Sequence, residues 1–286
     1  PGLSPARAFS AEGAVTMTAQ PQTKAMSLTT MVTLGVLVLL AIVPPLAKFA
    51  GYAFYLDLAT RLICLAIAAV SLNLILGYGG LVSFGHAASI GIGAYAVGIP
   101  AHHAFDDSFP VIASQSGLFH ILLAVGVSAF FALITGALCL RTRGVYFIMI
   151  TMAFSQMVFF LFVSIETYGG DDGLTIYNRS ELPLVNLDNA LTLYVICYVI
   201  LVAAVYLVHR ITNSRFGMAL QGAKGNEARM MAIGFNTYAY RLTAYVISGA
   251  MCGLAGAMIG NFTTFISPEM IDWTRSGELM FMVILG

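Results

Sequence analysis

The chain has 286 residues, of which 59% are hydrophobic and 9% are charged, and its formal net charge is zero. A water-soluble domain carries about 25% charged residues, so this composition excludes one and indicates a lipid environment. The 13 basic residues form no stripe interleaved with aromatic side chains, so we expect no nucleic-acid partner.

Residues 1–27 form a polar tail of small residues, expected to be disordered or cytoplasmic, with Met17 or Met26 as alternative natural starts. A membrane-crossing helix needs about 20 largely apolar residues. Such runs lie at 28–47, 58–77, 87–104, 117–140, 145–165, 191–209 and 238–260, and another begins near Gly277. The sequence therefore predicts an all-α polytopic bundle of about eight or more transmembrane helices. We expect residues 28–286 to form one transmembrane domain that continues past the end of this sequence.

The charged residues are distributed asymmetrically along the chain. Basic residues gather in the loops after the fourth and sixth runs: Arg141, Arg143, Arg210, Arg215, Lys224, Arg229 and Arg241. Acidic residues gather in the alternate connections: Asp106, Asp107, Glu166, Asp171, Asp172, Glu181, Asp188, Glu269 and Asp272. Because cytoplasmic loops are enriched in Lys and Arg, this pattern predicts a cytoplasmic N-terminus.

The segment from Asn73 to Tyr95 interrupts the apolar pattern with glycines, hydroxyls and a histidine. Irregular backbone at membrane depth is tolerated only where protein buries it or where it lines a wet cavity. One interpretation is a helix broken near residues 77–86 that lines a translocation pathway; the other is a tight cytoplasmic turn in which His86 caps a helix. The candidates for the pathway are Asn73, Gly79, Ser83, Gly85, His86 and Ser89.

The basic loop from Asn213 to Arg241 separates two membrane runs. Its centre, 226–233, predicts a short helix with one charged and one apolar face, and Gly234 suits a left-handed helix stop. The apolar face either docks on a soluble cytoplasmic partner or lies on the lipid surface. The candidate residues of this loop are Arg215, Gly217, Glu227, Ala228, Arg229 and Gly234.

The outer loop 168–183 is rich in glycine around Asp171 and Asp172, which we expect to dock an external partner. Its spacing does not fit a calcium loop, and the four cysteines are read as buried apolar residues, so no metal or disulfide framework is expected. The sequence contains no GxxxxGK[ST], HExxH or GxSxG pattern. It therefore predicts neither an ATP-binding phosphate loop nor a hydrolase.

Several segments together resemble one known family. The run GYGGLVSFGHAASIGIGAY, the segment from Arg141 to Gln156, GGDDGL from Gly169 and the basic loop with its following helix are similar to permeases of bacterial branched-chain amino acid ABC importers. Within that family they resemble the LivM branch and not its LivH partner. The resemblance runs from about residue 56 to the end.

The resemblance implies an inner-membrane complex with a second, LivH-like permease, two cytoplasmic ATP-binding subunits and a periplasmic substrate-binding protein. ATP and Mg would reside on the partner ATPases, with no cofactor on this chain, which would not itself be an enzyme. Glu227, Ala228 and Gly234 would belong to the ATPase-coupling loop. The expected cargo is branched-chain amino acids or related amides and carboxylates. Two rivals stay open: an ion-coupled secondary transporter or channel, and an ABC permease for urea, a sugar or another small polar solute.

Overall fold

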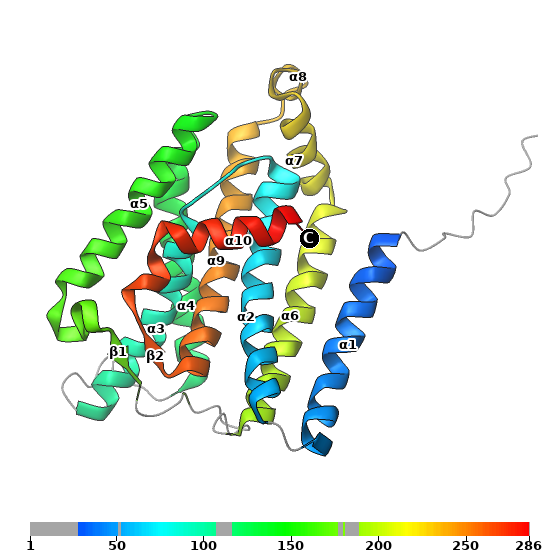
Figure 1. Cartoon of the computed structure of the whole chain (residues 1–286). Helices are drawn as coiled ribbons and strands as arrows, with labels where there is room; N and C mark the ends of the chain where they lie inside the picture. Colours follow the sequence, from blue (N-terminus) through cyan, green and yellow to red (C-terminus); the bar gives the residue numbers. More distant parts are fainter. Residues whose placement is uncertain (1–27, 51–52, 107–115, 177–179, 181–188, 286) are drawn as a thin grey trace, which may run out of the picture. The chain divides into compact units, whose positions relative to one another are not determined.

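The computed structural model describes residues 28–50, 53–106, 116–176, 180 and 189–285, which are largely helical (Figure 1). The expected tail 1–27 lies outside the described residues, as do Asp107, Glu181 and Asp188. Contacts divide the chain into two units, 1–38 and 39–286. In the first unit, apolar side chains of α1 (Leu28–Ala50), such as Met31 and Leu34, are exposed.

The second unit carries the remaining elements. Helix α2 (Ala53–Asn73) continues into the π-helix η1 (Leu74–Gly79). Then follow α3 (His86–Asp106), α4 (Gly117–Cys139), α5 (Val145–Ser164), the 3₁₀ turns η2 (Glu166–Tyr168) and η3 (Gly170–Asp172), strand β1 (Leu174–Thr175), α6 (Ala190–Thr212), α7 (Arg215–Gly225), α8 (Glu227–Ala232), α9 (Thr237–Thr263), strand β2 (Phe265–Ile266), η4 (Pro268–Ile271) and α10 (Trp273–Leu285). Each predicted apolar run therefore contains a helix.

Within the described residues, five helical segments are long and apolar enough to cross a membrane: 54–79, 117–139, 145–164, 190–212 and 237–263. The 13 described residues of α10 are too few for a crossing, because a helix rises about 1.5 Å per residue against a core of about 30 Å. Large apolar side chains on the outer faces, such as Leu122, Phe160 and Tyr206, are more than half exposed. The chain is thus an all-α, multi-pass membrane protein, and eight crossings stay a prediction.

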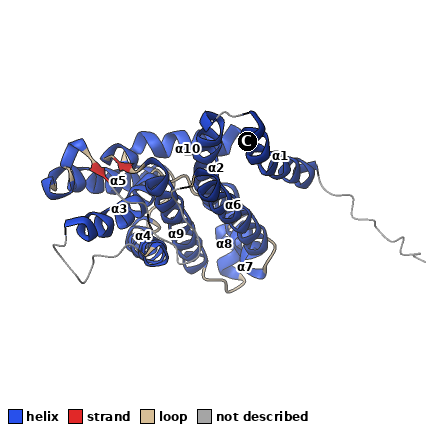
Figure 2. Ribbon diagram, turned by 90° about the horizontal axis from the view of Figure 1, so that it is seen from below, coloured by secondary structure: helices blue, strands red, loops and turns tan. Residues whose placement is uncertain are grey.

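Helix α9 is the central packing element and lies between α4 on one side and α2 and α6 on the other (Figure 2). Its glycines let neighbouring backbones approach closely. A methyl group added at Gly256 would collide with the Ile90 backbone, and one added at Gly93 would collide with the backbone of Gly253. Such close approach supplies the van der Waals contact that holds helices together where lipid provides no hydrophobic drive.

Two further connections organise the end of the chain. Strands β1 and β2 pair antiparallel, with Leu174 opposite Ile266, and so attach the glycine-rich outer loop to the segment that follows α9. Helix α10 runs across α9 and α2 and not alongside them, in both views (Figures 1 and 2). Its N-terminal end therefore lies near α5, and its C-terminal end near α2.

Candidate functional site

The predicted break between residues 77 and 86 is present. The π-helix η1 ends at Gly79, and the capping residue Gly80 adopts the left-handed conformation with φ 67°. That conformation is strained for residues with a side chain and is accessible to glycine. The Leu81 N–H still donates to the Ile75 carbonyl at 3.1 Å, after which the backbone stays non-helical until α3 begins at His86.

His86 lies deep inside the bundle and is 1% exposed. Its Nε2 lies 3.1 Å from Ser248 Oγ. Ser248 is the twelfth of the 27 residues of α9, which places it about 16 Å from the nearer helix end at about 1.5 Å per residue. The break therefore runs from Gly80, which faces the Lys224 side chain of the basic loop, to His86 in the interior of the bundle.

Protein groups satisfy the irregular backbone at this depth. The Phe84 N–H donates to Thr151 Oγ1 at 3.2 Å, and the Ser276 hydroxyl donates to the Phe84 carbonyl at 2.6 Å. The Ala87 N–H in turn donates to Ser276 Oγ at 2.9 Å. An unsatisfied backbone group in a membrane interior costs several kcal/mol, so these bonds from α5 and α10 make the break tolerable.

A cluster of neutral polar side chains surrounds the break; we call it the polar seam, and it consists of Ser71, Ser83, His86, Tyr245 and Ser248. Ser71 and Ser248 each donate a hydroxyl to the other's carbonyl, at 2.6 and 2.7 Å, which joins α2 to α9. The Ser83 and Tyr245 hydroxyls lie 3.4 Å apart, and the Tyr245 ring meets the His86 ring edge-on at 5.4 Å. Buried polar groups are stable when hydrogen-bonded in this way.

The predicted pathway residues fall into three places. Ser83, Gly85 and His86 lie together at the polar seam. Asn73 and Gly79 lie at the far end of α2 and η1, where Gly79 faces Leu220 of α7. The Ser89 carbonyl accepts a hydrogen bond from Ser128 of α4 at 3.1 Å. Sequence reasoning missed the seam members Ser71, Tyr245 and Ser248, whose only signal was an isolated hydroxyl in an apolar helix.

The basic loop folds into two short helices. The predicted helix at 226–233 is present as α8, capped by Asn226, whose side chain accepts the Arg229 N–H at 3.0 Å. Gly234 ends it with φ 95°, as predicted. Helix α7 was not predicted, and Gly217 within it packs so closely that an added methyl would collide with the Ile211 and Thr212 carbonyls.

Charged side chains connect these two helices to the bundle; we call Arg143, Lys224, Glu227, Thr237 and Arg241 the loop network. Glu227 pairs with Arg241 at 3.1 Å and with Arg143 at 3.4 Å, and it accepts the Thr237 hydroxyl at 3.2 Å. Arg241 also donates to the Ala223 carbonyl at the end of α7, at 3.0 Å. Lys224 donates to the Gly77 carbonyl of η1 at 2.7 Å. Helices α7 and α8 are thereby attached to the element that precedes the break.

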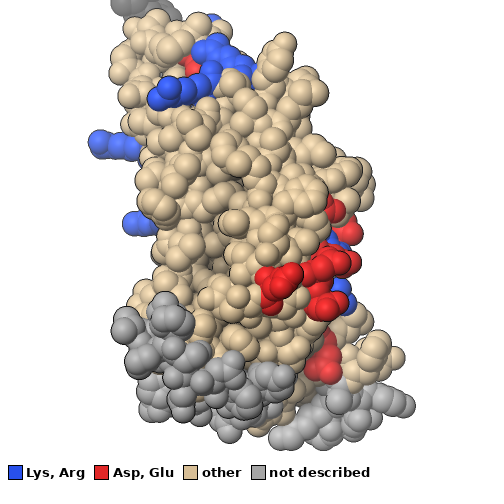
Figure 3. All heavy atoms as spheres, turned by 90° about the vertical axis from the view of Figure 1, so that its left-hand side faces the viewer, with Lys and Arg blue, Asp and Glu red and all other residues tan. Residues whose placement is uncertain are grey.

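The surface of the basic loop that faces away from the helix bundle is exposed. Ala228, Arg229 and the apolar side chains of Met231, Ile233 and Phe235 face away from the protein. Beside them lie two cavities of about 240 and 520 Å³, which share Leu140, Arg143, Glu227 and Arg241 in their walls. Arg215 begins α7 nearby in the chain. Basic side chains gather at this end of the molecule (Figure 3).

The outer loop presents its carboxylates to the surface. Asp171 and Asp172 are exposed on η3, and the glycines around them, Gly169, Gly170 and Gly173, all have positive φ. Acidic side chains gather on the lower half of the face seen in Figure 3, away from the basic end. The charge separation expected from the sequence is therefore visible on the surface.

Residues 54–286 match the family model described as "Branched-chain amino acid transport system / permease component". The chain is 25% identical over 254 residues to the high-affinity branched-chain amino acid transport system permease protein LivM of Salmonella typhimurium, covering 80% of this chain and 58% of that protein. It is 24% identical over 257 residues to LivM of Escherichia coli, with coverages of 80% and 58%. A probable LivM of Methanocaldococcus jannaschii is 25% identical over 251 residues, with coverages of 77% and 71%.

No solved structure matches the chain. The chain spans 58% of the length of the two bacterial relatives. The family match, in contrast, covers both the break with its polar seam and the whole basic loop. The chain therefore belongs to the family of branched-chain amino acid transport system permeases and is of the LivM type.

Proposed function

We propose that the chain is a permease subunit of an ABC importer that moves branched-chain amino acids, or related small amide or carboxylate solutes, into the cytoplasm. The observation that carries the proposal is the loop network, because it connects an exposed loop to the helix break inside the bundle. The names of the relatives support the transport of branched-chain amino acids.

Coupling would run through the loop 213–237. Two partner subunits bind and hydrolyse ATP with Mg, and their closure displaces α8, whose exposed Met231 and Ile233 suit a helix-in-groove contact. Displacement of α8 acts on Arg241 through Glu227, and displacement of α7 acts on Gly77 through Lys224. The break then moves between outward and inward access.

The remaining partners follow from the charge distribution and the family. A second, LivH-like permease supplies the other half of the pathway, and a periplasmic binding protein docks at Asp171 and Asp172, which are exposed. The chain lies in the bacterial inner membrane with a cytoplasmic N-terminus, since the basic loops mark the cytoplasmic side. Neither a cofactor on this chain nor a nucleic acid has a part in this mechanism.

Isolation of the complex from its native membrane in mild detergent tests the assembly. We expect the chain to co-purify with a second permease and two ATPases, which mass spectrometry identifies. A preparation that holds this chain alone, and that takes up leucine in vesicles without ATP, would overturn the proposal in favour of a secondary transporter.

Alanine substitution at Glu227 and Arg229 tests the coupling. In reconstituted vesicles, Glu227→Ala should reduce ATP-driven leucine uptake at least about tenfold, because one charge-assisted contact contributes about 1.5–3 kcal/mol. Arg229→Ala should reduce it less, while basal ATP hydrolysis persists in both. Arg210→Ala is the control, since Arg210 is exposed at the end of α6 and outside the loop network. Unchanged uptake and unchanged ATPase stimulation in both loop variants would contradict the coupling.

A further inference from the structure

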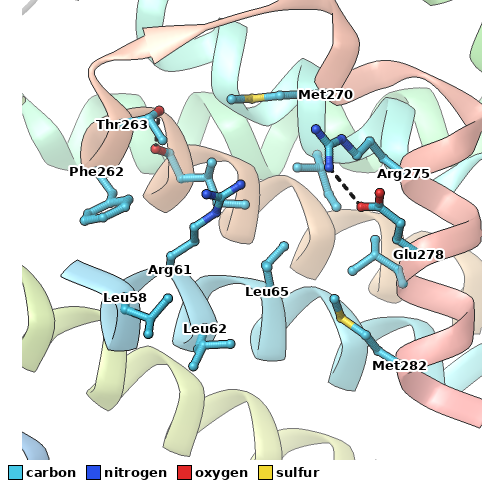
Figure 4. A pocket seen from close by; sticks show the side chains of 13 residues that line it. Leu58, Arg61, Leu62, Leu65, Phe262, Thr263, Met270, Arg275, Glu278 and Met282 are labelled. Carbon is cyan, nitrogen blue, oxygen red and sulfur yellow. Dashed lines mark hydrogen bonds and ion pairs between the residues drawn. The ribbon is translucent and has the colours of Figure 1, made fainter. Parts of the chain in front are cut away.

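A cavity of about 340 Å³ lies between α2, α9 and α10, away from the loop network. Most of its wall is apolar, including Leu58, Leu65, Phe262, Met270 and Met282 (Figure 4). Small-molecule sites are mostly apolar clefts of about 300–1,000 Å³ with a few polar groups that fix orientation. This cavity is therefore large enough for one small ligand.

Three charged side chains line the same cavity. Arg275 donates to Glu278 Oε2 at 2.9 Å, so these two charges balance each other. Arg61 forms no ion pair or hydrogen bond with any other described part of the chain. Its side chain extends from α2 into the space below Met270, as Figure 4 shows. Two guanidinium groups and one carboxylate thus line the cavity, and the nearest other carboxylate on α2, that of Asp57, is exposed one helical turn before Arg61 and is not part of the wall.

An arginine that has no ion pair or hydrogen bond within the described residues, and that lines a largely apolar cavity, is suited to a ligand with a negative charge. The planar guanidinium binds a carboxylate with two parallel hydrogen bonds. Urea and sugars lack both the anionic group and an aliphatic part that would fill the apolar wall.

We propose that this cavity binds an α-amino acid with an aliphatic side chain in transit, an inference that rests on the proposed function. Arg61 binds the carboxylate, and the Oε1 of Glu278, which is not occupied by Arg275, accepts the ammonium group. The side chain of the ligand packs on the apolar wall formed by Leu65, Met270 and Met282.

The cavity also adjoins the helix break. Ile90, which lines the cavity, lies one turn beyond His86 on α3. Ser276, which lies between Arg275 and Glu278 in sequence, holds both Phe84 and Ala87 by hydrogen bonds. A ligand that displaces α10 therefore acts on the backbone of the break, as a transit site requires.

Photo-leucine, a leucine analogue whose side chain carries a diazirine, tests the proposal on the assembled transporter in its native membrane. Illumination should label peptides of α2 and α10, and mass spectrometry locates the label. Excess leucine should displace the label, and so should isocaproate, which has the carboxylate and lacks the amine. Isoamylamine, which has the amine and lacks the carboxylate, and urea should not.

Variants separate the two polar contacts. Arg61→Gln should reduce labelling about tenfold or more, since a charge-assisted contact is lost. Glu278→Gln should weaken displacement by leucine and leave displacement by isocaproate unchanged. Arg61→Lys keeps the positive charge and should therefore keep part of the labelling. It replaces Arg61→Gln in the test if that variant does not fold. The control is Arg210→Gln, which removes a positive charge far along the chain and should change nothing.

The outcomes distinguish this inference from the proposed function. Labelling that is equal in Arg61→Gln, or displaced equally by isoamylamine, would overturn the inference. So would an absence of label in α2 and α10 in a preparation that still contains the ATPases and still transports leucine. Loss of the ATPases from the complex would instead overturn the proposed function.

Discussion

The polar seam and the loop network both join helices through polar side chains, and they use opposite chemistry. The seam employs hydroxyls and one imidazole, all buried, with hydroxyl-to-carbonyl bonds of 2.6 and 2.7 Å. The loop network employs charges that water reaches, since the side chains of Arg143 and Glu227 are 72% and 20% exposed. Removing an ion from water costs several kcal/mol. Uncharged polar groups therefore connect the helices in the interior, and ion pairs connect them at the edge.

The largest effect is expected from a charge placed in the seam. Ser248→Asp would bury a carboxylate between α2 and α9 and should abolish the monodisperse folded protein, because an unpaired buried charge costs several kcal/mol. Ser248→Ala removes the hydroxyl bonds alone and should cost about 1–2 kcal/mol. Size-exclusion chromatography in detergent and thermal unfolding measure both. A Ser248→Asp protein as stable as Ser248→Ala would contradict the difference between the two regions, because it would show that water reaches the seam.

An intermediate effect is expected in the loop network. Glu227→Gln keeps the shape and removes the charge, and should lower the free energy of unfolding by about 1 kcal/mol at low salt. The difference from the unmodified protein should shrink as the salt concentration rises, because ions screen exposed pairs. The loss in Ser248→Ala should stay constant over the same series. A salt-independent loss in Glu227→Gln would show that its contacts are as dry as those of the seam.

The smallest effect is expected at Asp272, which joins α5 to the start of α10. Its carboxylate accepts Gln156 Nε2 and the Thr274 hydroxyl, both at 2.6 Å. Burial raises the pKa of Asp272, but the hydrogen bonds from Thr274, Gln156 and two backbone amides outweigh it and hold that pKa below its ordinary value of 3.8. A lowered folded pKa means that the ionised group stabilises the fold in full above the ordinary pKa.

That stabilisation is lost as the pH falls below about 3.8 and through the lowered pKa of the folded state. Asp272→Asn should therefore lower thermal stability modestly at pH 7, where the ionised carboxylate stabilises in full, and should flatten the further loss of stability across this acid range. Glu269→Gln, an exposed neighbouring carboxylate, is the matched control. Identical acid profiles for Asp272→Asn and the unmodified protein would contradict the assigned hydrogen bonds.

Much of the fold was predictable because hydropathy and glycine act locally. The run 238–260 predicted α9, and Gly234 predicted the end of α8 with its positive φ. The break near residues 77–86 was also visible, since glycines and His86 interrupt an apolar run. Helix α7 was missed because its alternation of glycine, alanine and polar residues carries little apolar periodicity.

The contacts that build the seam could not be predicted, because they depend on tertiary packing. Ser71 and Ser248 are 177 residues apart and are single hydroxyls in apolar helices. The role of Ser276 could not be predicted either, because its hydrogen bond to Phe84 depends on the direction in which α10 crosses the bundle. The pairing of Glu227 with Arg143 and Arg241 required the relative placement of three separate segments.

The bond from Lys224 to Gly77 has a mechanical consequence. A lysine side chain is a flexible four-carbon stem. A flexible stem transmits tension but does not resist compression. Movement of α7 away from η1 would put the Lys224 side chain under tension and draw the π-helix with it. Movement of α7 toward η1 would only relax the same side chain. The loop can therefore pull on the break through this bond and cannot push on it.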